Sequence, residues 1–294
     1  RGRRRYRAWD FQSDAYMDAH GEFGSGRVRG EFRSSRRWRW SKQFVGMDNR
    51  MKPQIIAPDY GHHNANIEVS GKRVADSAAW KKLDTVMVIP AGAEVPTKVV
   101  MSWLNLYGPP NNSLFRIPTV AAINVEVGEA FTQTIDFIIN HPQLKDYKYI
   151  LTVEHDNIPP PDGLIRLQKQ MEDHPEYDCI GGLYWTKGPE GVPQIWGDPR
   201  DPVNNFRPQP PIPNQLVECC GTGMGFNLWR MDMFKDPDLR KPWFVTQKEG
   251  GVATQDLYFW GDARKHGYRC AVDCSVLVGH YDLKGQFGQA DFTW

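Results

Sequence analysis

Residues 119–153 read TVAAINVEVGEAFTQTIDFIINHPQLKDYKYILTV, and this stretch decides the fold. It opens with a short apolar run, 119–125, that suits a buried strand. Apolar residues then recur at helical spacing, which predicts an amphipathic helix: Val127, Ala130, Phe131, Ile135 and Ile138. A second apolar run, 149–153, predicts another buried strand. Strand, helix and strand in this order indicate a unit of a parallel sheet.

The same alternation continues on both sides of this unit. Upstream, an apolar run at 85–90 predicts a strand, and a helix follows that Thr97 should cap and Gly108 should end. Downstream, we expect a helix that opens near Asp162 and a strand at 179–184. The C-terminal half is less regular, and three elements are expected there: a glycine-containing strand at 217–226, a helix capped by Thr254 and ended by Gly267, and a strand at 268–278. These elements predict the α/β class, with a central, mostly parallel sheet flanked by helices and ligands bound at the carboxyl ends of its strands.

Composition indicates an ordinary globular protein. The chain has 294 residues, 40% hydrophobic and 24% charged, with a formal net charge of +1. It is too apolar and aromatic for a disordered chain, and it is long enough for a large core. The near-zero net charge excludes a uniformly basic nucleic-acid binder, although it leaves room for a local one.

Charge is concentrated at the N-terminus. Residues 1–50 hold twelve Arg and one Lys against six acidic residues, a net of +7 that leaves −6 for the rest. With its Gly, Ser and Trp residues, this segment is interpreted as a basic N-terminal extension: either a disordered or oligomer-contacting arm, or a nucleic-acid contact with Trp38 and Trp40 stacking on bases. We expect a linker or peripheral segment at 51–82, a catalytic domain at 83–282 and a C-terminal tail at 283–294.

The sequence shows no membrane anchor and no disulfide framework. No apolar stretch approaches the roughly 20 residues of a membrane span, and the N-terminus, which does not begin with Met, shows no signal-peptide core. Five cysteines are an odd number without a C-x-x-C pair, and they lie in apolar runs. Buried, reduced thiols and a cytoplasmic location are therefore expected.

Four acidic or imidazole side chains follow predicted strands or open a helix. Glu154 and Asp156 come directly after the strand at 149–153, and on an extended strand such positions point the same way. Two carboxylates at this position suggest a site for a divalent cation that also binds phosphate oxygens. Asp256 lies in the first turn of a helix, where the helix dipole favours an acid, and His280 follows the last strand.

Taken together, these motifs resemble the nucleotide-sugar-dependent glycosyltransferases of the GT-A fold, in particular the inverting family-2-like group. Glu154-His155-Asp156 looks like a version of that family's Asp-x-Asp element. Further segments match in order: 181–185 (GGLYW), 220–226 (CGTGMGF), 242–244 (PWF), 254–259 (TQDLYF) and 267–280, which ends in Gly-His. The resemblance covers roughly residues 83–282, and it implies a Rossmann-like GT-A fold.

The resemblance also implies roles for individual residues. Asp156 and His280 would ligate a divalent metal that bridges the diphosphate of a nucleoside-diphosphate sugar, with Glu154 and His155 close to that donor. A histidine in the ligand set favours Mn²⁺ over Mg²⁺. Asp256 would be the general base that activates the acceptor hydroxyl, so that the anomeric centre inverts.

Further residues would shape the donor and acceptor sites. The loop Pro90-Ala91-Gly92 would hold the nucleoside, and five residues would lie near the donor sugar or the acceptor: Trp185, Gly221, Thr222, Gly223 and Gln255. Two departures stand out. The first acid is Glu154 rather than Asp, and residues 125–130 lack the Arg that many relatives carry for the donor phosphates.

Other functions compete with this hypothesis. A nucleotidyltransferase also uses paired carboxylates on an α/β sheet, but it releases pyrophosphate. A nucleic-acid-binding protein with a vestigial core would fit the +7 segment, and a glycosyltransferase acting on modified bases of DNA, as in some bacteriophages, would combine both ideas. Asp59, His62 and His63 have metal-capable side chains, but adjacent histidines in a loop with Gly and Pro usually face solvent, and the sequence favours that interpretation.

Overall fold

The computed structural model describes residues 84–108, 117–188, 190–201, 206–246 and 254–282, and the backbone alone of 54–56 and 291–292. The predicted basic extension, most of the segment 51–82 and most of the tail 283–294 lie outside these residues. So do Trp38, Trp40, Asp59, His62 and His63. All described residues belong to one compact unit, 48–294.

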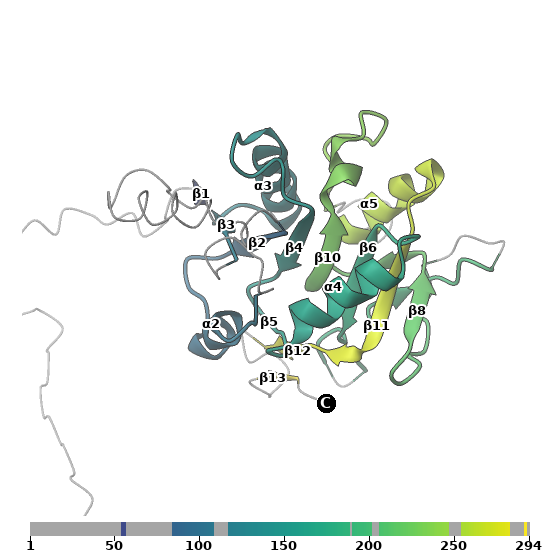
Figure 1. Cartoon of the computed structure of the whole chain (residues 1–294). Coiled ribbons are helices and arrows are strands. Elements are labelled where there is room, and N and C mark those ends of the chain that lie inside the picture. The colour runs from purple at the N-terminus through teal and green to yellow at the C-terminus, as the bar shows by residue number, and fades with distance from the viewer. Residues whose placement is uncertain are drawn as a thin grey trace, which may run out of the picture. The chain divides into compact units, whose positions relative to one another are not determined.

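The described residues form a central sheet of eight strands (Figure 1). In spatial order these are β1 (Gln54–Ile56), β3 (Thr119–Ile123), β2 (Thr85–Ala91), β4 (Tyr149–Val153), β10 (Phe226–Arg230), β6 (Cys179–Leu183), β11 (Cys270–Leu277) and β8 (Leu216–Cys219). Five of them, β3, β2, β4, β6 and β11, point the same way, whereas β1, β10 and β8 run antiparallel to their neighbours. The predicted α/β class with a mostly parallel sheet is confirmed.

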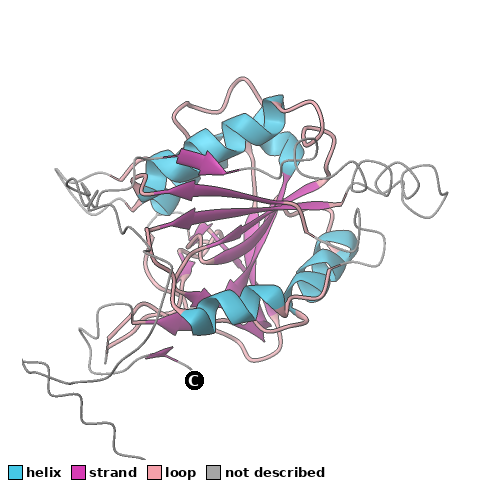
Figure 2. Cartoon of the chain, turned by 90° about the vertical axis from the view of Figure 1, so that its left-hand side faces the viewer, coloured by secondary structure: helices cyan, strands magenta, loops and turns pink. Residues whose placement is uncertain are grey.

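Helices cover both faces of the sheet (Figure 2). α3 (Val127–Asn140) and α5 (Gln255–Ala263) pack on one face, where Phe131 and Trp260 join a large aromatic core. α4 (Gly163–Asp173) packs on the other face with Leu164 and Leu167, and α2 (Thr97–Leu104) lies beside this second core. Alternate residues of each strand feed the two cores, as the pleat of a strand requires.

Of the helices α2, α3, α4 and α5, α3 is the one that starts with a side-chain cap. The Glu126 carboxylate accepts hydrogen bonds from the N–H groups of Gly128 and Glu129, and so caps α3. The prediction that Thr97 caps α2 is wrong, because Pro96 holds the cap position and Thr97 is the first helical residue. α2 also ends at Leu104, before the predicted stop at Gly108.

The predicted strand at 217–226 is broken into three pieces. β8 ends at Cys219, a short β9 (Gly221–Thr222) pairs with β7 (Ile195–Trp196), and β10 begins only at Phe226. The interruption coincides with close packing: a Cβ on Gly225 would lie 2.6 Å from Cζ of Tyr184. The chain therefore bends around Tyr184 instead of continuing as one strand.

A small second sheet places the C-terminal strand exit beside the end of β4. Its strands are β5 (Asn157–Ile158), β12 (Gly279–Tyr281) and β13 (Asp291–Phe292), and His280 pairs in register with Asn157. The remaining described elements are two 3₁₀ helices, η3 (Met231–Lys235) and η4 (Arg264–His266), after which Gly267 turns with φ +89°.

Two sequence expectations concern the environment of the chain. All five cysteines are buried and free, as predicted. Among the described residues, no helix combines the length and apolar character that crossing a membrane requires.

Candidate functional site

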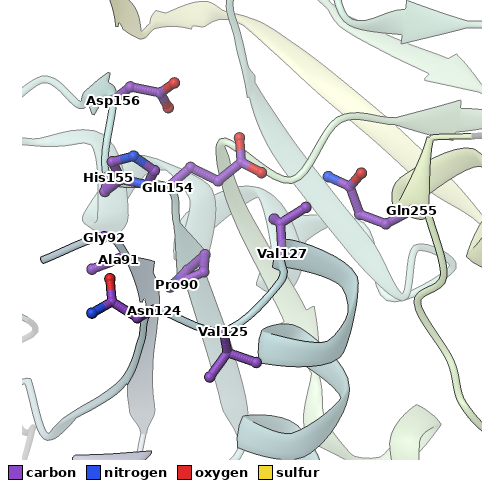
Figure 3. A pocket seen from close by; sticks show the side chains of 10 residues that line it. All are labelled: Pro90, Ala91, Gly92, Asn124, Val125, Val127, Glu154, His155, Asp156 and Gln255. Atoms are coloured by element: carbon purple, nitrogen blue, oxygen red, sulfur yellow. The ribbon is translucent and has the colours of Figure 1, made fainter. Parts of the chain in front are cut away.

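A cavity of about 380 Å³ opens where β2, β3 and β4 end (Figure 3). This is the edge at which the carboxyl ends of parallel strands meet, and where open α/β sheets bind ligands. The cavity is lined by Pro90, Ala91, Gly92, Asn124, Val125, Val127, Glu154, His155, Asp156 and Gln255. The predicted nucleoside loop 90–92 and the predicted donor-binding residues 154–156 thus share one cavity.

Glu154 and Asp156 reach this cavity in a different way from the one expected. β4 ends at Val153, and residues 155–156 form a turn in which the N–H of Asn157 donates to the carbonyl of Glu154, 3.1 Å away. The strand rule that positions i and i+2 point the same way therefore does not apply. Figure 3 shows Glu154 extending across the cavity towards Gln255, whereas Asp156 lies at the rim.

Asp156 lies between two nitrogen-bearing side chains. Its Oδ2 is 2.5 Å from Nζ of Lys187 and 3.6 Å from Nε2 of His280. Burial disfavours the charged carboxylate, but the hydrogen bonds and charges of these two partners outweigh burial and hold the pKa of Asp156 well below its usual range. The backbone N–H of Tyr281 also donates to the carbonyl of Asp156, 2.6 Å away, and ties β12 to this turn.

His280 is oriented by a backbone carbonyl. Its Nδ1 lies 2.7 Å from the carbonyl oxygen of Trp185. A carbonyl only accepts hydrogen bonds, so Nδ1 carries a hydrogen. Nε2 faces Asp156: in the charged ring it pairs with that carboxylate, and only in the neutral ring does it offer a lone pair. A carbonyl that fixes the ring in this way is typical of metal-binding histidines.

Glu154 is an acid whose charge is strongly disfavoured. Burial, followed by the nearby charges of Asp156 and Asp256, raises its pKa to about 8. Burial and these charges therefore favour the protonated form of Glu154. A perturbed acid in a cavity is a common mark of a functional site.

Asp256 lies near the cavity, close enough for its charge to act on Glu154. It is 6% exposed, and its Oδ1 accepts hydrogen bonds from the hydroxyl of Thr254 and from the N–H of Leu257. Burial raises its pKa, while these two donors partly counteract burial. Its neighbour Gln255 lines the cavity directly.

The residues expected near the donor sugar or acceptor lie in two settings. Gln255 lines the cavity, and Trp185 is half-buried next to His280. Gly221, Thr222 and Gly223 are buried, and the hydroxyl of Thr222 donates to the carbonyl of Gln194. A Cβ on Gly223 would lie 2.3 Å from the hydroxyl oxygen of Tyr184, so this glycine makes room for the tyrosine.

Sequence reasoning missed Lys187, Tyr184 and Asn124 as parts of this site. Lys187 is 31 residues from Asp156, and no periodicity or motif joins the two. The Tyr184 hydroxyl accepts from the N–H of Gly225 and lies near the acids. Asn124 could have been suspected from the sequence, because Asn adopts the left-handed backbone region more readily than most residues. In the structure it turns the chain at the exit of β3 with φ 58°.

Asp156 and His280 are the residues that would hold the metal that the sequence resemblance implies. Among the described residues, no group of three or more His, Cys, Asp or Glu side chains is placed to hold a metal. Asp156 and His280 nevertheless offer an oxygen and an oriented nitrogen close together, and a catalytic metal needs open positions for substrate and water. The described residues thus offer two possible ligands for the metal that the resemblance implies, Asp156 and His280.

Comparisons with known proteins bear on the fold alone. No protein-family model matches the chain, and no curated protein does either. Among solved structures, the crystal structure of A197 from STIV is similar, with a TM-score of 0.50 and 16% sequence identity over 68% of this chain and 86% of A197. At this identity the likeness shows a shared overall fold and carries no activity over.

Proposed function

We propose that this chain is a metal-dependent, inverting glycosyltransferase of the GT-A fold that uses a nucleoside-diphosphate sugar. One observation carries the proposal. Segments far apart in the sequence, 90–92, 154–156, 255–256 and 280, meet at or beside a single cavity at the carboxyl ends of the sheet. Three of these segments, 154–156, 255–256 and 280, carry the sequence resemblance to that enzyme family, and the loop 90–92 is the one that the resemblance implies for the nucleoside.

The cavity suggests how the donor binds. The loop Pro90-Ala91-Gly92 and Asn124 form the end at β2 and β3, and this end would take the nucleoside. Asp156 and His280 would hold the divalent metal, for which the imidazole ligand favours Mn²⁺. When bound, the metal would stabilise the negative charge that develops on the departing diphosphate.

Asp256 would act as the general base. Its carboxylate would take the proton of the acceptor hydroxyl while that oxygen forms a bond to the anomeric carbon. The bond from this carbon to the phosphate oxygen breaks at the same time, and the nucleoside diphosphate leaves with the electron pair. Attack opposite the leaving group inverts the anomeric centre. A raised pKa supports this role, because a base works best when its pKa lies near the working pH.

The first experiment measures nucleotide binding. Thermal shift and calorimetry with uridine, guanosine, thymidine and cytidine diphosphates, each with and without Mn²⁺, should reveal one diphosphate that stabilises the protein only with Mn²⁺. At a ligand concentration of about 100 times Kd the stabilisation should be about 2.7 kcal/mol. Asp156→Asn should abolish this response, whereas Asp173→Asn, which alters an exposed acid paired with Lys169, should keep it.

Turnover then distinguishes the chemistry. Once the nucleotide is known, incubation with matching nucleotide sugars should release the nucleoside diphosphate. Release of pyrophosphate would indicate a nucleotidyltransferase instead. Asp256→Asn should lower turnover by about 10²- to 10⁴-fold and leave nucleotide binding intact. Asp262→Asn, on the same helix but bonded to the N–H of Arg240, should keep full turnover. Absence of any metal-dependent nucleotide response would contradict the proposal.

A further inference from the structure

Lys187 is the cation that this structure places in the candidate site. It lies 2.5 Å from Oδ2 of Asp156, the same oxygen that faces His280. Both side chains of this pair are mostly buried, with 21% of the Lys187 side chain and 15% of the Asp156 side chain exposed. An ion pair shielded in this way is much stronger than a surface pair.

A short backbone hairpin holds Lys187 in place. Trp185 forms a bridge with Pro193, and Thr186 and Val192 exchange further hydrogen bonds, so that residues 185–186 lie against residues 192–193. The same segment reaches both members of the Asp156–His280 pair: the carbonyl of Trp185 orients His280, and the ammonium of Lys187 contacts Asp156. The position of Lys187 is thus built by the fold.

The other obvious phosphate-binding feature near the cavity is already occupied. The N-terminus of α3 follows the cavity residues Asn124 and Val125, and helix N-termini commonly bind phosphate. Here the Glu126 carboxylate takes the N–H groups of Gly128 and Glu129, at 2.9 and 3.1 Å. An anion would meet that carboxylate instead of free N–H groups. The sequence of this helix start, 125–130, also contains no Lys or Arg.

A divalent cation at Asp156 Oδ2 would repel the Lys187 ammonium from that oxygen, because two positive charges close together disfavour each other. Binding of the metal would release the ammonium at the place where a diphosphate would meet the metal. Lysine is a common phosphate ligand that acts as a point charge on a flexible stem.

We propose that Lys187 competes with the divalent metal for Asp156 in the ligand-free protein and, once the metal displaces it, binds the donor diphosphate. The second half of this inference rests on the proposed function, whereas the competition for Asp156 does not. Lys187 would supply the positive charge that the start of α3 lacks. Binding of the metal would thereby free Lys187 to bind the donor.

The test compares Lys187→Met with wild type in two titrations. In the first, Mn²⁺ alone is titrated and free Mn²⁺ is followed by electron paramagnetic resonance. Lys187→Met should bind Mn²⁺ roughly ten- to a hundred-fold more tightly, the range expected when a charge-assisted hydrogen bond to the ligand is removed. In the second, at saturating Mn²⁺, its affinity for the responding nucleoside diphosphate should fall roughly tenfold.

Two further variants serve as controls. Lys169→Met removes an exposed lysine that also pairs with an aspartate, at 2.6 Å from Asp173, and should change neither titration. Lys187→Arg keeps the charge and should retain most of the nucleotide affinity. Thermal melting of each variant without ligand checks that the fold is intact.

The outcomes separate this inference from the proposed function. Unchanged Mn²⁺ affinity in Lys187→Met, including the case in which neither protein binds Mn²⁺, would overturn the competition. Tighter Mn²⁺ binding with unchanged nucleotide affinity would overturn the role at the diphosphate. If wild type binds Mn²⁺ but no nucleoside diphosphate, the proposed function fails, while tighter Mn²⁺ binding by Lys187→Met still upholds the competition.

Discussion

Asp256 is a buried carboxyl group whose charged form the fold disfavours. At 6% exposure it loses most of its hydration, and the Thr254 hydroxyl and the Leu257 N–H replace part of it. Burial still dominates and leaves the pKa above the ordinary value of 3.8. The group therefore keeps its proton to higher pH in the folded protein than in the unfolded chain.

This shift predicts how stability depends on pH. Between pH 3.8 and the raised pKa of Asp256, the folded protein holds a proton that the unfolded chain has lost, so the free energy of unfolding falls as pH rises. The contribution is fully present below pH 3.8 and is lost once pH exceeds the folded pKa. Asp256→Asn lacks this titration. Urea unfolding at a series of pH values should show the stability of wild type relative to Asp256→Asn declining with rising pH.

One result would contradict this prediction. A stability difference between wild type and Asp256→Asn that stays constant across the pH series would mean that the pKa of Asp256 is not raised. The same comparison with Asp262→Asn corrects for the general effect of removing an acid from α5.

At the scale of elements, the break between β8 and β10 is an example of packing that overrides strand propensity. The N–H of Gly225 donates to the Tyr184 hydroxyl at 2.9 Å, and the chain passes so close to the ring that a side chain has no room. This contact supports the tyrosine beside Glu154 and Asp256.

We therefore expect Gly225→Ala to destabilise the protein by about 1–3 kcal/mol, because its Cβ would lie 2.6 Å from the Tyr184 ring and 2.7 Å from Oδ1 of Asn157. Gly261→Ala is the matched control. A Cβ there meets nothing within 4 Å, and alanine in a helix should stabilise by about 0.5–1 kcal/mol. Urea unfolding measures both variants. Equal effects of the two substitutions would contradict the packing explanation.

Local patterns made some elements predictable and left others out of reach. The helix at 127–140 and the strand at 149–153 follow from apolar periodicity, which depends only on neighbouring residues. The broken strand could not be predicted, because Tyr184, which imposes the break, lies 41 residues from Gly225. The ion pair between Lys187 and Asp156 depends on a hairpin and a turn that meet only in the folded chain. The sequence showed the acids at the strand ends, but it did not show which residues they contact in the folded protein.

At the scale of the whole molecule, β10 joins two groups of parallel strands. It runs antiparallel between β4 and β6, so that β3, β2 and β4 lie on one side and β6 and β11 on the other. Trp229 of this strand lies in register with Ile150 of β4 and Cys179 of β6. Its ring stacks on Trp260 of α5 at 5.5 Å, and its Nε1 donates to the hydroxyl of Thr152.

Because Trp229 contacts both strand groups and α5, its removal should weaken the whole unit together. Trp229→Ala should lower the free energy of unfolding by about 3–5 kcal/mol, the usual cost of emptying a large core site. Leu104→Ala, which truncates a side chain that is 73% exposed on α2, should change it by no more than about 0.5 kcal/mol. Circular dichroism and tryptophan fluorescence during urea unfolding should give coincident, single transitions for both variants. Two separate transitions in Trp229→Ala would mean instead that the strand groups fold independently, and that the cavity on β2, β3 and β4 does not depend on β10 for its shape.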